Sequence, residues 1–171
     1  MNIKNKSKKH CVLIIDGVDG VGKTTVCRRL SEKLGFPVIK MPGMKEYFDN
    51  SAEKMSKYFN SIVEQFNPGQ FILDRGYPSS LVYSKIFERQ DNLGYIPSHC
   101  KTLSAKVFIL TAESATLSLR KAKDEIPSIT QEKRIVLDQE YKDLANFMRW
   151  EIIDTTELTT EETCQKIIEK I

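Results

Sequence analysis

The sequence lacks long hydrophobic runs and a strong charge of one sign. No apolar run approaches the roughly 20 residues that a membrane-spanning helix needs. Lys and Arg total 26 against 23 Asp and Glu, and a net charge of +3 is too small for a nucleic-acid-binding surface. We therefore expect neither a membrane nor a nucleic-acid partner. The mild positive charge suits a protein that binds small phosphorylated anions.

Cysteines are few and scattered along the chain. The four of them are Cys11, Cys27, Cys100 and Cys164. No CxxC pair occurs, and we assign no metal-binding role to the neighbours His99 and Cys100, which stand in a predicted loop. The pattern argues against a disulfide framework and favours a cytoplasmic or other reducing compartment.

The first ten residues, MNIKNKSKKH, are basic and polar. They contain no apolar core and no cleavage site of small residues, so they do not resemble a secretory signal. The remaining sequence has no repeats and no low-complexity linker, and 171 residues suffice for one domain. We interpret residues 1–10 as a disordered basic tail and residues 11–171 as a single domain.

Short apolar runs alternate with longer segments of helical period in that domain. The runs cover residues 12–16, 37–41, 71–74, 106–110 and 150–153. Such an alternation is typical of a parallel sheet that is covered by helices on both faces. We therefore expect a three-layer α/β domain with a five-stranded parallel sheet.

Three helical segments carry apolar stripes with the 3.6-residue period. The first stripe consists of Met55, Tyr58, Phe59, Ile62, Val63 and Phe66. The second consists of Leu137, Tyr141, Leu144, Ala145 and Met148. The last helix begins at a predicted capping box, Thr159 with Glu162. Its expected buried side holds Cys164, Ile167, Ile168 and Ile171.

The strongest motif directly follows the first apolar run. Residues 17–25 read GVDGVGKTT and satisfy GxxxxGK[ST], with an apolar run before the motif and an amphipathic segment after it. Backbone N–H groups of such a loop surround phosphate oxygens at a helix N-terminus. Lys23 can reach the β and γ phosphates, and the Thr24 hydroxyl can join a magnesium shell. The sequence thus predicts a P-loop NTPase fold that binds ATP and Mg²⁺ through Gly17, Asp19, Gly20, Val21, Gly22, Lys23, Thr24 and Thr25.

The third apolar run helps to choose among P-loop proteins. It ends in Asp74-Arg75, whereas remodelling ATPases usually carry an acidic pair at this place. The [NT]KxD segment with which GTPases recognise guanine is absent from the sequence, which argues against a GTPase. At the carboxyl end of a strand beside the loop, Asp74 suits magnesium. Arg75 suits bidentate binding of a phosphate on an acceptor molecule. These features predict a small-molecule kinase.

Two blocks resemble the thymidylate kinase family of nucleoside monophosphate kinases. The loop DGVDGVGKTT is similar to that family's (E/D)GxDGxGKTT, and DRGYPSSLVY at residues 74–83 is similar to its DRYxxSSLAYQ. The resemblance implies that Asp19 accepts a hydrogen bond from the acceptor's 3′-hydroxyl and that Arg75 holds its phosphate. Tyr83 would lie along the acceptor's sugar and base, and Asp74 would orient the phosphate and the hydrated magnesium.

The resemblance also implies a short lid after the fourth strand. Thymidylate kinases carry an arginine either in the phosphate loop or in the lid, and this loop has none. Cations that could stabilise the transferring charge are Arg120, Lys121, Lys123 and Arg134. The predicted catalytic residues are Lys23, Asp74, Arg75, Arg120 and Arg134.

The chain departs from the family where thymine is recognised. Lys40-Met41-Pro42-Gly43 replaces the family's Arg-Glu-Pro-Gly, Gly76 replaces the Tyr of DRY, and no arginine lies between Arg29 and Arg75. The base of the acceptor therefore stays open.

The leading hypothesis is transfer of the γ-phosphoryl of ATP to a deoxynucleoside 5′-monophosphate. A deoxynucleoside kinase is the closest alternative, although such enzymes place a Glu base where this chain has Met41. A polynucleotide 5′-kinase, a kinase for another phosphorylated acceptor and an inactive nucleotide-binding module are further alternatives. Small nucleotides are the expected partners, and a homodimer stays open.

Overall fold

The computed structural model describes residues 11–43, 52–65, 69–88, 105–120 and 129–171. Five strands form one sheet in which all neighbouring strands run parallel. They are β1 (Cys11–Gly17), β2 (Val38–Lys40), β3 (Gln70–Asp74), β4 (Lys106–Thr111) and β5 (Glu151–Asp154), in the order β2-β3-β1-β4-β5. The five predicted strands are confirmed, each end within one residue of its expected place.

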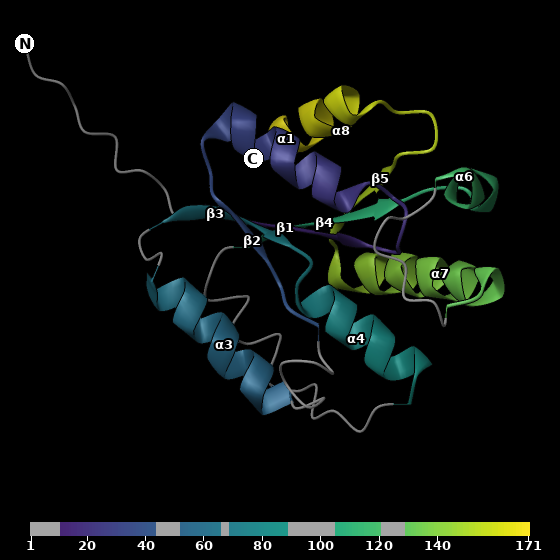
Figure 1. Ribbon diagram of the computed structural model, residues 1–171, viewed down its shortest axis with the longest axis horizontal. Helices are drawn as coiled ribbons and strands as arrows, with labels where there is room; N and C mark the ends of the chain where they lie inside the picture. The colour runs from purple at the N-terminus through teal and green to yellow at the C-terminus, as the bar shows by residue number, and fades with distance from the viewer. Residues whose placement is uncertain (1–10, 44–51, 66–68, 89–104, 121–128) are drawn as a thin grey trace, which may run out of the picture.

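Helices cover both faces of the sheet (Figure 1). On one face α1 (Lys23–Leu34) packs against α8 (Thr160–Ile168). On the other face α4 (Tyr77–Ile86) packs against α7 (Gln131–Met148), and α3 (Ala52–Gln65) lies on the same side. The short α6 (Ser114–Leu119) follows β4. The three-layer P-loop NTPase fold is thereby confirmed.

The hydrophobic core is built around the central strand β1. Residues 12–15 of this strand are fully buried because helices cover both of its faces. Phe71 on β3 and Phe108 on β4 are equally buried on either side of it. The ends of these strands are therefore held by rigid packing, and the loops that follow them start from fixed points.

Two residues that were predicted to be buried are exposed. Tyr58 of the first stripe is 36% exposed, whereas its neighbour Phe59 is buried. The edge strand β2 has three residues, and its Val38 is 38% exposed as well, so the helices cover this edge of the sheet incompletely. Ile171 is 40% exposed because α8 ends at Ile168 and the last residues leave the packed face. The side chains of Met55 and Val63, and all of Phe66, lie outside the described residues.

Other predictions about the ends of the chain can be checked directly. The capping box is confirmed, since Thr159 Oγ1 accepts from Glu162 N at 3.2 Å and Glu162 Oε2 accepts from Thr159 N at 2.9 Å. Cys27 and Cys164 are buried, Cys11 is half-buried, and all three are free thiols. Residues 1–10, His99 and Cys100 lie outside the described residues. Within the described parts of the chain, no helix is both long and apolar enough to cross a membrane.

Candidate functional site at the ends of β1 and β3

The phosphate loop joins the end of β1 to the start of α1. Gly17 has φ +139°, and a Cβ atom at this position would lie 2.1 Å from the carbonyl oxygen of Leu110 on β4. Only glycine fits this close approach of two backbones. The loop ends at Gly22, whose carbonyl accepts from Val26 N at 2.9 Å in the first turn of α1. The predicted strand–loop–helix context of the motif is confirmed.

Lys23 is folded into the loop. Its Nζ donates to the carbonyl of Val18 at 2.7 Å and lies 3.6 Å from Asp19 Oδ1. The residue is 6% exposed. Burial, and secondarily the positive charge of Arg75, lower the pKa of Lys23 from 10.5 to about 8, although nearby carboxylates oppose this shift. A cation that is so poorly hydrated gains strongly from an anionic partner.

Thr24 and Asp74, the two predicted magnesium ligands, are in direct contact. Thr24 Oγ1, in the first turn of α1, donates to Asp74 Oδ2 at 2.7 Å, and Asp74 itself is aligned with Ile15 of β1 at the end of β3. A hydroxyl and a carboxylate are hard oxygen ligands of the kind that Mg²⁺ prefers, with water and phosphate oxygens completing its shell. Thr24 and Asp74 therefore fit a magnesium ion that is shared with a bound phosphate. No cluster of three or more His, Cys, Asp or Glu side chains occurs among the described residues.

The three predicted acceptor-binding residues also lie together. The Arg75 guanidinium forms an ion pair with Asp19 through Nη2, and its Cζ lies 6.0 Å from the ring centre of Tyr83. Tyr83 donates to Asp19 Oδ2 at 3.4 Å. Burial raises the pKa of Tyr83 to about 12, so its hydroxyl keeps its proton at neutral pH.

Arg75 carries a permanent positive charge beside the phosphate loop. Its Nη1 lies 3.5 Å from the carbonyl oxygen of Gly17. Burial opposes the charge, but the acidic groups of Tyr141 and Asp19 outweigh it and raise the pKa of the guanidinium. The structure thus brings two cations, Lys23 and Arg75, to the same carboxylate oxygen, Asp19 Oδ1.

The backbone turn that presents Arg75 is strained. Arg75 has φ +68°, in the left-handed region that non-glycine residues rarely adopt. Two bonds fix the turn to β1: Arg75 N donates to Ile15 O at 3.0 Å, and Gly76 N donates to Asp16 Oδ2 at 3.0 Å. A Cβ atom on Gly76 would lie 2.9 Å from Ile14 Cγ2. This contact gives a physical reason for the glycine where the thymidylate kinase pattern has tyrosine.

Three further residues belong to this site although no motif in the sequence assigns them to it: Asp16, Ser79 and Tyr141. Asp16 is fully buried at the end of β1 and accepts hydrogen bonds from both Ser79 and Tyr141. The available signals were a carboxylate that closes an otherwise apolar strand, and a tyrosine in a core stripe. A buried carboxylate needs donors, and a buried tyrosine hydroxyl needs a partner.

One predicted lid arginine directly follows α6, and the other lies on α7. Arg120 follows α6 and donates to Thr155 Oγ1 at 2.9 Å and to Thr155 O at 2.7 Å. Thr155 Oγ1 donates to the Val21 carbonyl at 3.3 Å, so Arg120 contacts the phosphate loop through Thr155, which no motif in the sequence indicates. Arg134 is half-buried in the first turn of α7. Lys121 and Lys123 lie outside the described residues, and the catalytic roles of the two arginines stay predictions.

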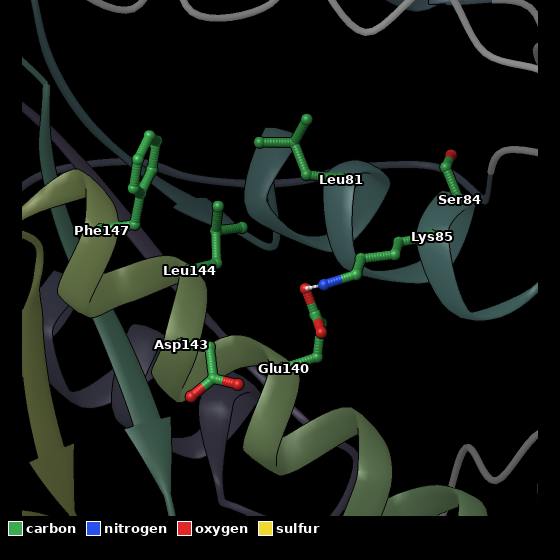
Figure 2. A pocket seen from close by; sticks show the side chains of 7 residues that line it. All are labelled: Leu81, Ser84, Lys85, Glu140, Asp143, Leu144 and Phe147. Carbon is green, nitrogen blue, oxygen red and sulfur yellow. Dashed lines mark hydrogen bonds and ion pairs between the residues drawn. The ribbon is translucent and has the colours of Figure 1, made fainter.

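A groove between α4 and α7 lies apart from these residues. It has a volume of about 620 Å³ and is lined by Leu81, Ser84, Lys85, Glu140, Asp143, Leu144 and Phe147. Figure 2 shows the Lys85–Glu140 ion pair at this groove, with Nζ 2.5 Å from Oε1. None of the lining residues is among the predicted site residues.

Comparison with known proteins supports the P-loop assignment. Residues 12–74, from β1 to the end of β3, match the AAA family, described as "ATPase family associated with various cellular activities". The chain is 34% identical over 116 residues to the SPbeta prophage-derived uncharacterized protein YorR of Bacillus subtilis. It is 32% identical over 74 residues to thymidylate kinase of Ureaplasma parvum. These alignments cover 64% and 39% of this chain, but only 66% of YorR and 31% of the thymidylate kinase.

Solved structures extend the similarity over nearly the whole fold. The crystal structure of B. subtilis YorR in complex with phosphorylated GDP has a TM-score of 0.72 at 26% identity, covering 93% of this chain and 94% of that one. Thymidylate kinase from Candida albicans has a TM-score of 0.71 at 21% identity, covering 94% and 90%. Deoxyadenosine kinase from M. mycoides with bound dCTP has a TM-score of 0.60 at 20% identity, covering 93% and 97%. The resemblance to thymidylate kinases that the two motifs indicated is confirmed.

Proposed function

We propose that this chain, a P-loop protein with a thymidylate kinase-like fold, is a nucleotide kinase that transfers the γ-phosphoryl of ATP to a deoxynucleoside 5′-monophosphate. The observation that carries the proposal is the position of Arg75. Its guanidinium lies 3.5 Å from the backbone carbonyl of Gly17, the first residue of the phosphate loop. An arginine at this place can bind a second phosphate beside the one that the loop holds, through two parallel hydrogen bonds.

Catalysis would consist mainly of positioning and charge neutralisation. ATP would supply the phosphoryl group, and a bound magnesium ion would supply positive charge that offsets the phosphate oxygens. The loop amides and Lys23 bind and orient these oxygens, while Thr24 and Asp74 would hold the metal. Arg75 holds the acceptor phosphate close to the loop. No general base is required, because a monophosphate oxygen is already ionised at neutral pH.

The residues beside Arg75 give the acceptor site its expected sugar preference. Asp19 has a carboxylate within reach of both Arg75 and the Tyr83 hydroxyl. As an acceptor it suits a free 3′-hydroxyl of the sugar, the role that the family resemblance implies. Tyr83 would lie against the sugar and disfavour an additional 2′-hydroxyl, so we propose deoxyribose in the acceptor. The B. subtilis relative, described in complex with phosphorylated GDP, supports a nucleotide as the ligand class.

A deoxynucleoside kinase is the second candidate, which the similarity in fold to deoxyadenosine kinase favours. Such an enzyme must remove a proton from a sugar hydroxyl and needs a carboxylate base near it. This chain has Met41 at the corresponding place, directly after β2, where its N–H donates to the carbonyl of Asp74 at 3.1 Å. A nucleoside also offers Arg75 no anion. These two points support a monophosphate as the acceptor.

The test is ADP release measured with a panel of deoxynucleosides, deoxynucleoside monophosphates and ribonucleoside monophosphates, with an acceptor-free reaction as the baseline. We expect release above the baseline with at least one deoxynucleoside monophosphate and a lower rate with its ribose counterpart. Arg75→Ala should remove this gain without changing the acceptor-free rate. Phosphorylation of deoxynucleosides but not of monophosphates would refute the proposal.

A further inference from the structure

We infer that Ser79 is a positioning residue for the acceptor site: its hydroxyl, oriented by the Asp16 carboxylate, holds the Arg75 guanidinium in place to bind the acceptor's anion. The inference rests on the proposed function, because Arg75 is assigned there to the acceptor phosphate. Ser79 lies in the first turn of α4, four residues after Arg75. Its Oγ lies 3.0 Å from Arg75 Nη1, closer than the 3.5 Å contact of that nitrogen with Gly17 O.

The hydrogen-bond chemistry fixes the orientation of this hydroxyl. A guanidinium has donors only, so Ser79 Oγ must accept from Arg75. Asp16 Oδ1 lies 2.7 Å away and can only accept as a carboxylate, so it is the acceptor for the single proton of the Ser79 hydroxyl. The Tyr141 hydroxyl lies 2.9 Å from Ser79 Oγ and can donate to Ser79 or to Asp16. Ser79 is therefore a donor toward Asp16 and an acceptor toward Arg75.

Asp16 is itself held rigidly. Its Oδ1 accepts from Gly17 N at 2.8 Å and from the Tyr141 hydroxyl at 3.1 Å, and its Oδ2 accepts from Gly76 N at 3.0 Å and Ser79 N at 2.9 Å. The carboxylate is fully buried and thus keeps one orientation. One buried group therefore links the first residue of the phosphate loop with the turn after β3 and the start of α4.

Holding Arg75 matters because its backbone alone does not determine where its charge lies. The side chain has several rotatable bonds, and ordering them costs free energy each time an anion binds. Arg75 Nη2 is bound by Asp19, a residue that the acceptor's sugar is proposed to use as well. Three contacts of Arg75 Nη1 can persist when Asp19 turns to the sugar: Ser79 Oγ at 3.0 Å, Gly17 O at 3.5 Å and Asp16 Oδ1 at 3.8 Å. The Ser79 contact is the shortest of them, so it contributes most to the position of the guanidinium while the acceptor binds.

The test is a double-mutant cycle with steady-state kinetics, using the most active monophosphate of the panel as the acceptor. We expect Ser79→Ala to raise the acceptor's KM about tenfold and to leave the KM of ATP within about twofold. In the Arg75→Ala background the same substitution should change neither value, since Ser79 acts through Arg75. Ser31→Ala is the matched control, because it removes a hydroxyl that donates to Phe36 O at 2.6 Å at the far end of α1. We expect this control to leave both KM values within twofold.

Two outcomes would overturn the inference. One is that Ser79→Ala raises the KM of ATP as much as that of the acceptor. The other is that Ser79→Ala raises the acceptor's KM equally in the wild type and in the Arg75→Ala variant. Either result would show that Ser79 has only a structural role. If Ser79→Ala does not fold, Ser79→Cys keeps the side-chain volume with a weaker acceptor, and the same split is expected.

A second measurement separates this inference from the proposed function. The ¹⁵N relaxation of the Arg75 Nε–H group, assigned by its loss in Arg75→Ala, reports the order of the side chain without any turnover. Ser79→Ala should lower this order, and an unchanged order would refute the inference. If the wild type phosphorylates no monophosphate while the order of the Arg75 side chain falls in Ser79→Ala, the proposed function is wrong. The role of Ser79 in positioning Arg75 is then still supported.

Discussion

Lys23→Met should make the protein more stable and inactive at the same time. Lys23 is 6% exposed, and burial lowers its pKa from 10.5 to about 8. At pH 7 the folded protein therefore holds a charged ammonium in a place that disfavours the charge. Methionine has a similar length and no charge, so it removes this cost. The loop also loses the cation that is proposed to bind the transferring phosphoryl group, and turnover should fall by orders of magnitude.

The size of the stability gain follows from the two pKa values. The shift from 10.5 to about 8 corresponds to a penalty of about 3 kcal/mol when the lysine is charged in both states. Because the folded pKa is the lower one, the unfolded chain binds more protons between these values. The penalty is therefore complete below the folded pKa and disappears as the pH rises toward 10.5. We therefore expect the free energy of unfolding of Lys23→Met to exceed that of the wild type by about 3 kcal/mol at pH 7 and by about 2 kcal/mol at pH 9.

Urea unfolding of the wild type and of Lys23→Met at these two pH values checks the expectation. Lys166→Met is the matched control, because Lys166 is exposed on α8 and its replacement should change the free energy of unfolding by less than about 0.5 kcal/mol. A Lys23→Met protein that is no more stable at pH 7, or whose advantage does not fall at pH 9, would refute the reasoning about the buried charge. Near-normal turnover of a folded Lys23→Met protein would refute the assignment of the loop.

Three further predictions concern other parts of the site. Arg75→Ala should raise the acceptor's KM about a hundredfold, as steady-state kinetics with both substrates would show. Arg75→Lys should recover little of the loss, because an ammonium group cannot form the two parallel hydrogen bonds of a guanidinium. Full recovery by lysine would contradict this prediction. Arg120→Ala and Arg134→Ala should each lower kcat more than they raise the KM of ATP, whereas an unchanged kcat in both would remove these arginines from the transfer step. Gly17→Ala should lower the free energy of unfolding by about 3 kcal/mol or more, since its Cβ would lie 2.1 Å from the carbonyl oxygen of Leu110. Thermal unfolding checks this prediction, and an unchanged melting temperature would contradict it.

The sheet and the phosphate loop could be predicted because their signals are local. An apolar run that is buried on both faces looks different from an amphipathic helix, and the glycine pattern of the loop is specific. The parallel alignment of β1 with β3 brings their ends to one edge of the sheet, where Thr24 contacts Asp74. The same alignment brings Arg75 to the loop.

The network that holds Arg75 could not be predicted in this way. Asp16 and Tyr141 are separated by 125 positions, and their hydrogen bond depends on how α7 packs against the sheet. Nothing in a helical stripe distinguishes a tyrosine that only fills space from one that also binds a carboxylate. Thr155 was missed for the same reason, since its contact with Val21 depends on where the segment after β5 passes the loop. The exposure of Tyr58 likewise depends on the edge of the sheet, which a helical pattern alone does not report.

The order of the strands has a consequence for how such a protein can evolve. The phosphate loop begins at the end of β1 and Arg75 follows β3, and these two strands are hydrogen-bonded neighbours. Adjacent strands lie about 4.8 Å apart, so the hydrogen-bonded backbones of β1 and β3 set the interval between the two proposed phosphate-binding points. Insertions or substitutions in the helices and connections around the proposed acceptor site leave this interval unchanged. If the proposed function holds, a lineage with this sheet can exchange one acceptor base for another while the distance for phosphoryl transfer stays the same.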